Sequence, residues 1–374
     1  MQPTLDHRDV GGKNKNLNSE SIAKCKREDE EYCGSSLFGL HDLDVEIQPA
    51  AQFKEFACRE ETVLKRKRGE NGDPLGGDHL RSSIHRPSLS SSSHARFVNK
   101  EVRLIKLDNL LVKEDYLDKR WEEATGELVD EIIFLSKHVA SSNRPALTVH
   151  PIGTPHILEG EVLFAGGKPG WAALPNPRIG PWLRLLRTIA ESHKLTPEFE
   201  VTLEATHHGP LTNSPTMFVE IGSTEEYWRR QDAAQAVALL VWRGLGLGGG
   251  IAEGDWGRNG GSNKILYGIG GGHYAPRHMD IVLKDGVWVG HLLSGYSLLM
   301  EDPGHSKAQQ NSEAVHGTWR EAIMVAFEAT KSAFPGGEII AHLDHKSFKS
   351  WQRNAITTFL VEQNIKIGKP SDFS

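Results

Sequence analysis

From residue 97 to the C-terminus, short apolar runs alternate with segments of helical periodicity, and this alternation restricts the possible folds more than any other feature. The runs VRLIKL (102–107), EIIFLSKH (131–138) and KILYGI (264–269) have the length and composition of strands. The segments GPWLRLLRTIAESHKL (180–195) and STEEYWRRQDAAQAVALLVWRGLG (223–246) have the spacing of helices with one buried face. We therefore expect an α/β fold, with a largely parallel or mixed sheet and helices on both faces.

Residues 1–95 differ from the rest of the chain in composition. Apolar residues are sparse there, and the end of the segment is first basic, then rich in glycine and proline, then rich in serine. We predict that residues 1–95 form a disordered or atypical N-terminal extension and that 96–374 form the folded domain. The basic cluster Lys65–Arg68 is compatible with a nuclear import signal, but a solvated linker is the favoured interpretation.

Charge and composition exclude several classes of protein. The formal net charge is −6, so no global field attracts nucleic acid, although a local basic patch can still do so. The sequence contains no run of about 18 apolar residues, so we predict no membrane-spanning helix. The three cysteines, Cys25, Cys33 and Cys58, all lie in the N-terminal quarter. A metal bound to the rest of the chain would therefore need His, Asp or Glu ligands.

Polar residues recur where the predicted strands end. These positions are Lys137-His138, His150, Thr206 to His208, His273, and His342 with His345. One histidine after a strand is more often structural than catalytic, but five such strands are harder to explain in that way. Because the carboxyl ends of parallel strands lie at one edge of a sheet, we expect these side chains to gather there as a metal site or a general-base site.

The segment EATHHGP (204–210) is the most compact of these signals. A turn before Gly209-Pro210 would let both imidazoles face one cleft, whereas a regular strand would point one of them away, and the sequence favours neither. Glu204 is placed to orient an imidazole or to pair with a nearby basic residue. We assign Glu220, in the next apolar run, to structure, because a carboxylate there can accept from the amides that begin the following helix.

The glycine-rich stretch GIGGGHYAPRH (268–278) fits neither a Walker loop nor a dinucleotide-binding turn. Glycines let backbone amides approach an anion closely, so Gly270 to Gly272 are candidate oxyanion donors; the alternative is a tight bend. His273 is a candidate metal ligand. Tyr274 is placed to stack on a base or close a pocket, and Arg277 to hold a phosphate.

The stretch GGKPGWAALPNPRIGPW (166–182) mixes basic and aromatic residues. Lys168, Trp171 and Arg178 suit a single-stranded RNA end, whose bases stack on aromatic rings. The alternative is a surface flap packed by its tryptophans. No G-x-S-x-G motif is present, so a serine-esterase mechanism is disfavoured.

Several of these motifs together resemble the archaeal and plant type of D-aminoacyl-tRNA deacylase, over roughly residues 97–374. The motifs are SKH, LTVHPIG, GGKPGWAALPNPRIGPWLRLL, EATHHGP, FVEIGSTEEYWRRQDAA and GIGGGHYAPRH. The resemblance implies hydrolysis of the ester between a D-amino acid and the 3′-terminal ribose of tRNA, with Zn²⁺ as cofactor. It also implies a fold related to peptidyl-tRNA hydrolases and nucleoside phosphorylases and, for plants, clearance of aldehyde-modified D-aminoacyl-tRNA. We expect a cytoplasmic monomer.

The candidate residues fall into three groups under this interpretation. The catalytic candidates are His207, His208, Glu204, His138 and Lys137. The candidate zinc ligands are His207, His208, His273 and His150. The candidate contacts to the substrate or tRNA are Lys168, Trp171, Arg178, Gly270, Gly271, Gly272, Tyr274 and Arg277.

Two other functions stay open. Members of the family open with an apolar first strand that residues 1–95 do not show. The chain is therefore either a deacylase or a catalytically impaired relative that only binds tRNA or a nucleotide. A nucleoside phosphorylase-like enzyme is the third possibility, but it needs a phosphate site that the sequence does not clearly show.

Overall fold

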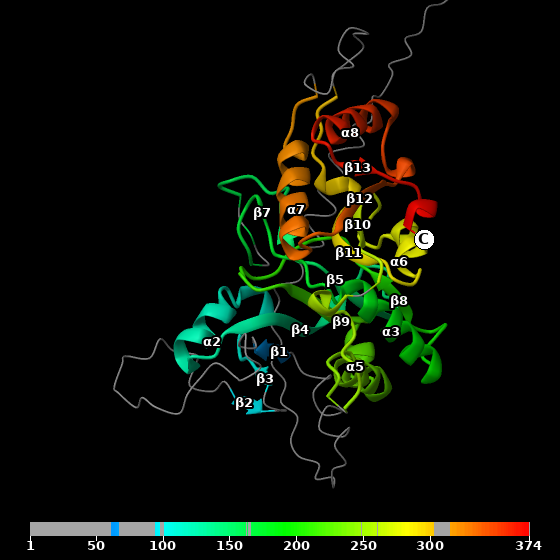
Figure 1. Cartoon of the computed structure of the whole chain (residues 1–374). Helices are drawn as coiled ribbons and strands as arrows, with labels where there is room; N and C mark the ends of the chain where they lie inside the picture. Colours follow the sequence, from blue (N-terminus) through cyan, green and yellow to red (C-terminus); the bar gives the residue numbers. More distant parts are fainter. Residues whose placement is uncertain are drawn as a thin grey trace, which may run out of the picture. The chain divides into compact units, whose positions relative to one another are not determined.

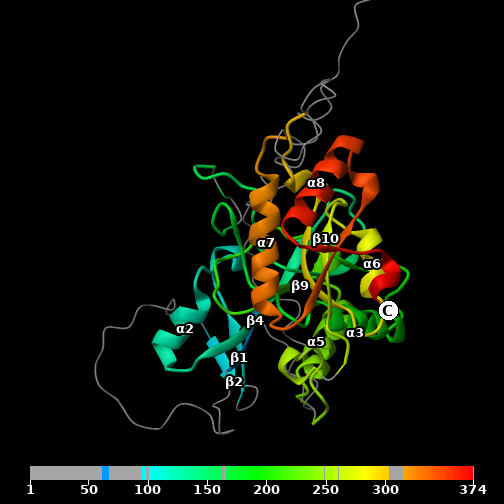
Figure 2. The same ribbon diagram turned by 45° about the horizontal axis from the view of Figure 1, so that its top comes forward.

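The computed structural model describes residues 61–66, 94–97, 101–161, 163, 166–247, 249–259, 261–302 and 315–373 (Figures 1 and 2). The strands are β1 (Glu61–Arg66), β2 (His94–Phe97), β3 (Val102–Lys106), β4 (Val129–Val139), β5 (Ala146–His150), β6 (Gly153–Thr154), β7 (Trp171–Ala172), β8 (Glu200–Leu203), β9 (Thr216–Ser223), β10 (Lys264–Ile269), β11 (Trp288–Leu293), β12 (Glu338–Leu343) and β13 (Lys366–Ile367). The helices are α2 (Leu117–Thr125), α3 (Ile179–Ser192), α4 (Glu225–Trp228), α5 (Gln231–Gly244), α6 (Pro276–Val282), α7 (Trp319–Ala333) and α8 (Ser350–Glu362).

The larger sheet has seven strands in the order β2-β3-β1-β4-β9-β5-β8. Strand β1 is antiparallel to both of its neighbours. Strand β4 is parallel to β9, but β9 is antiparallel to β5, which is in turn parallel to β8. The fold is therefore α/β with a mixed sheet, as predicted, and the carboxyl ends of its strands do not share one edge.

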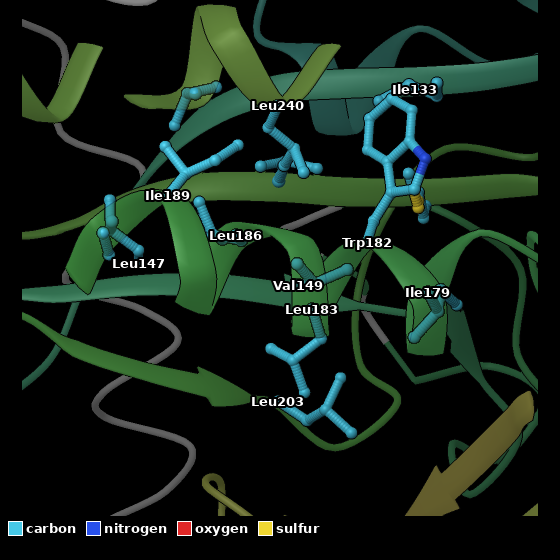
Figure 3. Packing of buried hydrophobic residues seen from close by; sticks show 14 of the residues in the cluster. Ile133, Leu147, Val149, Ile179, Trp182, Leu183, Leu186, Ile189, Leu203 and Leu240 are labelled. Atoms are coloured by element: carbon cyan, nitrogen blue, oxygen red, sulfur yellow. The ribbon is translucent and has the colours of Figure 1, made fainter. Parts of the chain in front are cut away.

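Helices α3 and α5 cover one face of this sheet, and Figure 3 shows the packing. Alternate residues of a strand point to opposite faces, so Ile133, Leu147 and Val149 meet the apolar stripe of α3. Trp182 and Leu186 of that stripe are fully buried. On the opposite face, α2 packs over the β1, β3 and β4 end of the sheet.

The smaller sheet has four strands in the order β11-β10-β12-β13, and all its pairs are parallel. Helices α7 and α8 pack on one of its faces. Helix α3 also contacts this sheet, and a Cβ on Gly180 would lie 2.9 Å from the carbonyl oxygen of Val287. Among the described residues, no helix has the length and apolar character needed to cross a membrane.

The prediction that residues 1–95 lie outside the packed domain is wrong for β1. Its segment ETVLKR is an inner strand of the larger sheet, and Val63 and Leu64 are at most 1% exposed, on opposite faces. Lys65 lies within this strand, and its ammonium pairs with Asp130 and Glu131 at 3.4 and 3.1 Å. Lys65 is therefore part of the folded sheet and not of a solvated linker. The other residues of that prediction, apart from the backbone of β2, lie outside the described ranges.

Candidate active site

Neighbouring strands place three of the site residues on one face of the larger sheet. Glu220 of β9 pairs with Ser136 of β4 on one side and with Thr148 of β5 on the other. His138 and His150 each lie two residues further along their strands, and strand alternation points them to the same face as Glu220. Because β4 is parallel to β9, His138 lies beside Gly222, two residues after Glu220. Because β5 is antiparallel to β9, His150 lies beside Phe218, two residues before Glu220.

Glycine at position 222 makes room for one of these imidazoles. Gly222 is the strand partner of His138. A Cβ at this position would lie 3.0 Å from Cδ2 of His138, which is closer than side-chain carbons normally approach. The ring can therefore lie across β9 and reach both buried glutamates.

The THH segment reaches the same place from the end of β8. Glu204 continues the face of β8 and forms an isolated bridge with Tyr274. His207 directs Nδ1 to the carbonyl oxygen of Ala205 at 2.7 Å. Gly209 follows with φ +108°, and a Cβ there would lie 2.8 Å from Cβ of Ile152. This left-handed turn keeps His207 and His208 together, with ring centroids 4.1 Å apart.

Glu204 is the centre of the cluster. Its Oε1 lies 3.3 Å from Nδ1 of His138, and its Oε2 lies 3.4 Å from Nε2 of His207 and 3.0 Å from Nε2 of His273. Glu220 contributes a second carboxylate, with Oε2 3.6 Å from Nδ1 of His138 and 3.7 Å from Nε2 of His150. These contacts bring together side chains from β4, β5 and β9 and from the loops that follow β8 and β10.

The electrostatics divide the imidazoles into two kinds. Burial alone would lower the pKa of His138, but the charges of Glu204 and Glu220 outweigh it and raise that pKa to about 9. Burial, reinforced by the neighbouring imidazoles, lowers the pKa of His207 and brings that of His208 to about 3. Burial would also lower the pKa of His150, but Glu220 outweighs it and raises that pKa. At neutral pH the site therefore combines a cationic His138, and a His150 that favours the charged form, with two neutral imidazoles, His207 and His208.

The donor set fits a metal ion. His207 points Nδ1 at the carbonyl oxygen of Ala205, to which only an N–H can donate, so its neutral ring leaves Nε2 as a bare lone pair. His150 points Nδ1 at the carbonyl oxygen of Pro151 in the same way, so its Nε2 is free for a metal when the ring is neutral. The lone pair of His207 then faces the carboxylate of Glu204 at 3.4 Å, which is acceptor against acceptor. Within the described part of the chain, both oxygens of Glu204 and Nδ1 of His208 also lack hydrogen-bond partners.

The described residues form three groups of possible metal ligands; His150, Glu204 and Glu220 form one that overlaps the other two, which share no residue with each other. Of these two, one is His150, His207 and His208; the other is His138, Glu204 and His273, with the ligand atoms of each group within 4.8 Å of one another. Imidazole nitrogens and carboxylate oxygens are ordinary zinc ligands. All the residues predicted as zinc ligands therefore lie in this cluster.

Most of the predicted catalytic residues also meet here, but Lys137 does not. It is adjacent to His138 in a strand, so its side chain leaves from the opposite face. Its ammonium lies over the ring of Trp228, 5.2 Å from the centroid. The prediction of a catalytic role for Lys137 is contradicted by this alternation.

Arg178 was also placed wrongly by the sequence interpretation. It is 1% exposed and binds both oxygens of Glu131 through Nε and Nη2, at 2.7 and 2.9 Å. Its Nη1 donates to the carbonyl of Gly244 at 2.9 Å. The guanidinium is a buried structural ion pair, so it is not exposed to bind RNA.

The glycine loop has a different role from the one predicted. The amide of Gly270 donates to Leu293 at 2.7 Å, and that of Gly271 to Oγ of Ser347 at 2.6 Å, so neither is available to an oxyanion. Gly272 is exposed beside His273. The hydroxyl of Tyr274 lies 3.1 Å from Nε2 of His138, which places this residue in the cluster.

The other two proposed RNA contacts, Lys168 and Trp171, take no part in the contacts described above for the histidine–glutamate cluster. Lys168 is exposed, and its carbonyl accepts from Thr154 at 2.7 Å. Trp171 is half-buried in β7 and packs against the apolar cluster under α2. Contacts of both with a substrate stay predictions.

Two features of the site were missed. The side chain of Glu220 contacts imidazoles rather than the helix amides that its position suggested; the alternation of β9 would have revealed its buried face. His291 directs Nδ1 to Oγ1 of Thr206 at 3.0 Å and Nε2 to the carbonyl of Ala173 at 2.8 Å. This buried ring holds Thr206, the residue before His207, in place. No local sequence pattern predicts this role for His291.

The fold and the site define an α/β protein with a seven-stranded mixed sheet, a four-stranded parallel sheet and a buried histidine–glutamate centre. The sequence profile described as D-aminoacyl-tRNA deacylase matches residues 125–368, which include the whole centre. The chain therefore belongs to the D-aminoacyl-tRNA deacylase family.

Relatives extend this result to plants and archaea. The chain is 67% identical to a D-aminoacyl-tRNA deacylase of Arabidopsis thaliana over 278 residues, which cover 74% of this chain and 88% of the relative. It is 32% identical to the Aeropyrum pernix protein of the same name, over 66% of this chain and 78% of that one. A crystal structure of a conserved protein of unknown function superposes with a TM-score of 0.53 and 26% identity, covering 75% of this chain and 88% of that chain. A relation to peptidyl-tRNA hydrolases and nucleoside phosphorylases stays a prediction.

Proposed function

We propose that this chain hydrolyses the ester between a D-amino acid and the 3′-terminal ribose of tRNA, at a zinc-loaded histidine–glutamate centre. The family supports the substrate class, since the relatives in plants and archaea carry this name. The observation that supports the metal is the bare Nε2 of His207 facing the carboxylate of Glu204. A cation between a buried lone pair and a buried carboxylate would stabilise both, and Zn²⁺ accepts both as ligands.

The ligands for zinc would come from one of the groups described above, His150, His207 and His208. Zinc, when bound, supplies a water of lowered pKa and polarises a carbonyl. Backbone carbonyls hold the rings of His150 and His207 in the tautomer that leaves Nε2 free, which orients both ligands before substrate arrives.

The remaining residues move and hold protons. Glu204 is buried and ionised, because the charges of His138 and His273 outweigh burial and lower its pKa, so it can accept a proton from the attacking water. Cationic His138 donates Nε2–H to the hydroxyl of Tyr274. The phenol proton of Tyr274 is then free to point at the developing oxyanion or the leaving ribose oxygen. Burial and Glu204 raise the pKa of Tyr274, which keeps that proton in place.

The first strand also bears on the choice between functions. The absence of an apolar first strand was the argument for an impaired, binding-only relative, and β1 supplies an inner strand from ETVLKR. The complete histidine–glutamate centre then favours catalysis over binding alone.

The function is tested by the release of tyrosine from D-Tyr-tRNA and L-Tyr-tRNA under single-turnover conditions. We expect rapid release from the D-ester and a much slower reaction of the L-ester, since chirality acts through the alignment of the ester carbonyl. Equal rates for the two esters, or tight binding of D-Tyr-tRNA without release, would contradict the proposal.

We also propose that the substrates include aldehyde-modified D-aminoacyl-tRNA and that the protein acts as a cytoplasmic monomer. The first of these is what the resemblance of the sequence motifs to the plant type of the family implies. Deacylation rates before and after aldehyde treatment of D-Tyr-tRNA test the substrate range. Light scattering of the purified protein and imaging of a fluorescent fusion test the other two points.

A further inference from the structure

The carboxyl edge of the smaller sheet is a second place where a ligand can bind. Parallel sheets bind ligands where successive connections leave in opposite directions. Strand β10 lies between β11 and β12, so this point falls between β10 and β12. The loops that follow these two strands are 270–275 and 344–349.

A buried carboxylate joins these two loops. Asp344 is 7% exposed, and its Oδ2 accepts from Oγ of Ser347 at 3.0 Å. The same hydroxyl accepts the amide of Gly271 at 2.6 Å, so the glycine loop is held to Asp344 through Ser347. The Oδ1 of Asp344 lies 3.2 Å from Nε of Arg277. One carboxylate therefore fixes both the glycine loop and the arginine that follows it.

The arginine is placed for an external anion. The side chain of Arg277 is 46% exposed although its Nε is held by Asp344. Its two terminal nitrogens have no partner among the described residues, and a planar guanidinium with two free nitrogens suits a phosphate. His345 and Lys346, next in sequence to Asp344, are exposed and add to the basic character of this edge.

The same loop also reaches the histidine–glutamate centre. His273 lies two residues after Gly271 and four before Arg277, and its Nε2 is 3.0 Å from Glu204. In the terminal nucleotide of an aminoacyl-tRNA, the ester and the 5′-phosphate lie at opposite ends of one ribose. A site that holds the ester beside His273 therefore needs an anion site nearby, and Arg277 offers a half-exposed guanidinium four residues after His273.

We propose that Arg277, oriented by Asp344, binds the 5′-phosphate of the 3′-terminal nucleotide of the tRNA. This inference rests on the proposed function. Asp344 is a positioning residue that acts through Arg277 and the glycine loop.

The test compares two minimal esters, D-tyrosyl-adenosine, which has no phosphate, and the D-tyrosyl ester of the trinucleotide CCA. The measured quantity is the ratio of kcat/KM for the trinucleotide to kcat/KM for the nucleoside. We expect Arg277→Ala to lower this ratio about tenfold or more, mainly through KM, which is the scale of losing a charged hydrogen bond. The matched control is Arg258→Ala, since Arg258 is 61% exposed and pairs with Asp255 at 3.4 Å; it should leave the ratio at the wild-type value.

Asp344→Asn separates positioning from a general loss of structure. It should lower the ratio in the wild-type background and should not lower it further in the Arg277→Ala background. A loss of loop structure alone would reduce kcat for both esters and leave the ratio unchanged. An unchanged ratio in Arg277→Ala, or a further fall on adding Asp344→Asn, would overturn the inference.

A binding measurement tests the phosphate site separately from the hydrolysis of the ester. Failure of the wild-type protein to hydrolyse either ester would refute the function. Calorimetric titration with adenosine 5′-monophosphate and with adenosine then tests Arg277 by itself. We expect the wild-type protein to prefer the monophosphate and Arg277→Ala to lose that preference about tenfold. Equal affinities of the wild-type protein for the two ligands would contradict the phosphate site.

Discussion

At the scale of single residues, the two adjacent histidines carry the sharpest prediction. His207→Ala or His208→Ala should lower deacylation of D-aminoacyl-tRNA at least about a hundredfold, the scale of losing a general base or a ligand to the metal. The fold should survive, because each ring lies at the site rather than in the apolar core. Single-turnover kinetics and circular dichroism check this, with His193→Ala, an exposed residue after α3, as the control. Near-wild-type rates in both variants would make this segment a scaffold.

Glu220 now requires a different prediction from the one its sequence position suggested. Its carboxylate contacts His138 and His150, not the start of a helix. Glu220→Gln removes the charge that helps to keep His138 cationic, so the rate should fall about ten- to a hundredfold. Glu191→Gln, on the exposed face of α3, is the matched control. A loss of thermal stability with an unchanged rate would restore the purely structural assignment.

At the scale of elements, β1 should determine whether the larger sheet is stable. Leu64 is 1% exposed and packs in the cluster under α2. Leu64→Ala should therefore lower the free energy of unfolding by about 2–4 kcal/mol, as large-to-small changes in cores do. Ile251→Ala, at an 89% exposed position, should change it by less than about 0.5 kcal/mol. Equal urea midpoints for the two variants would show that β1 adds nothing to the packed sheet.

The strands also explain which parts of the site the sequence could predict. The sequence predicted that histidines at the ends of apolar runs gather in one place, and the structure brings His138, His150 and His207 together, although not for the predicted reason. These residues meet on one face of a mixed sheet, not at one edge of a parallel sheet. Strand β1 escaped prediction because ETVLKR has only two strongly apolar residues. Arg178 was misassigned because its partner Glu131 lies in another strand, and no local pattern shows such a pairing.

At the scale of the whole molecule, the ion pairs around Glu131 should set the stability at acid pH. Burial alone would raise the pKa of Glu131, but Arg178 and Lys65 outweigh it and lower that pKa to about 2, from 4.5. The unfolded chain therefore binds this proton first, and the stabilisation present above about pH 4.5 is lost as the pH falls toward 2.

Urea unfolding between pH 2 and 6 measures this effect. Glu131→Gln should be less stable than the wild type at neutral pH, because it leaves Arg178 buried without a charged partner. Its stability should also fall less steeply below about pH 4.5, since the carboxylate that takes up the proton is gone. Parallel pH curves for the two proteins would show that Glu131 has no part in the acid response.

The most direct measurement of the central claim is the single-turnover release of tyrosine from D-Tyr-tRNA by zinc-loaded, chelator-treated and zinc-restored protein. We predict that the zinc-loaded protein is active and that removal of the metal lowers the rate at least about a hundredfold. Return of zinc should restore the rate, with the bound zinc measured in each sample. Full activity in protein shown by elemental analysis to hold no metal would contradict the claim that the His–Glu cluster is a zinc centre for D-aminoacyl-tRNA hydrolysis.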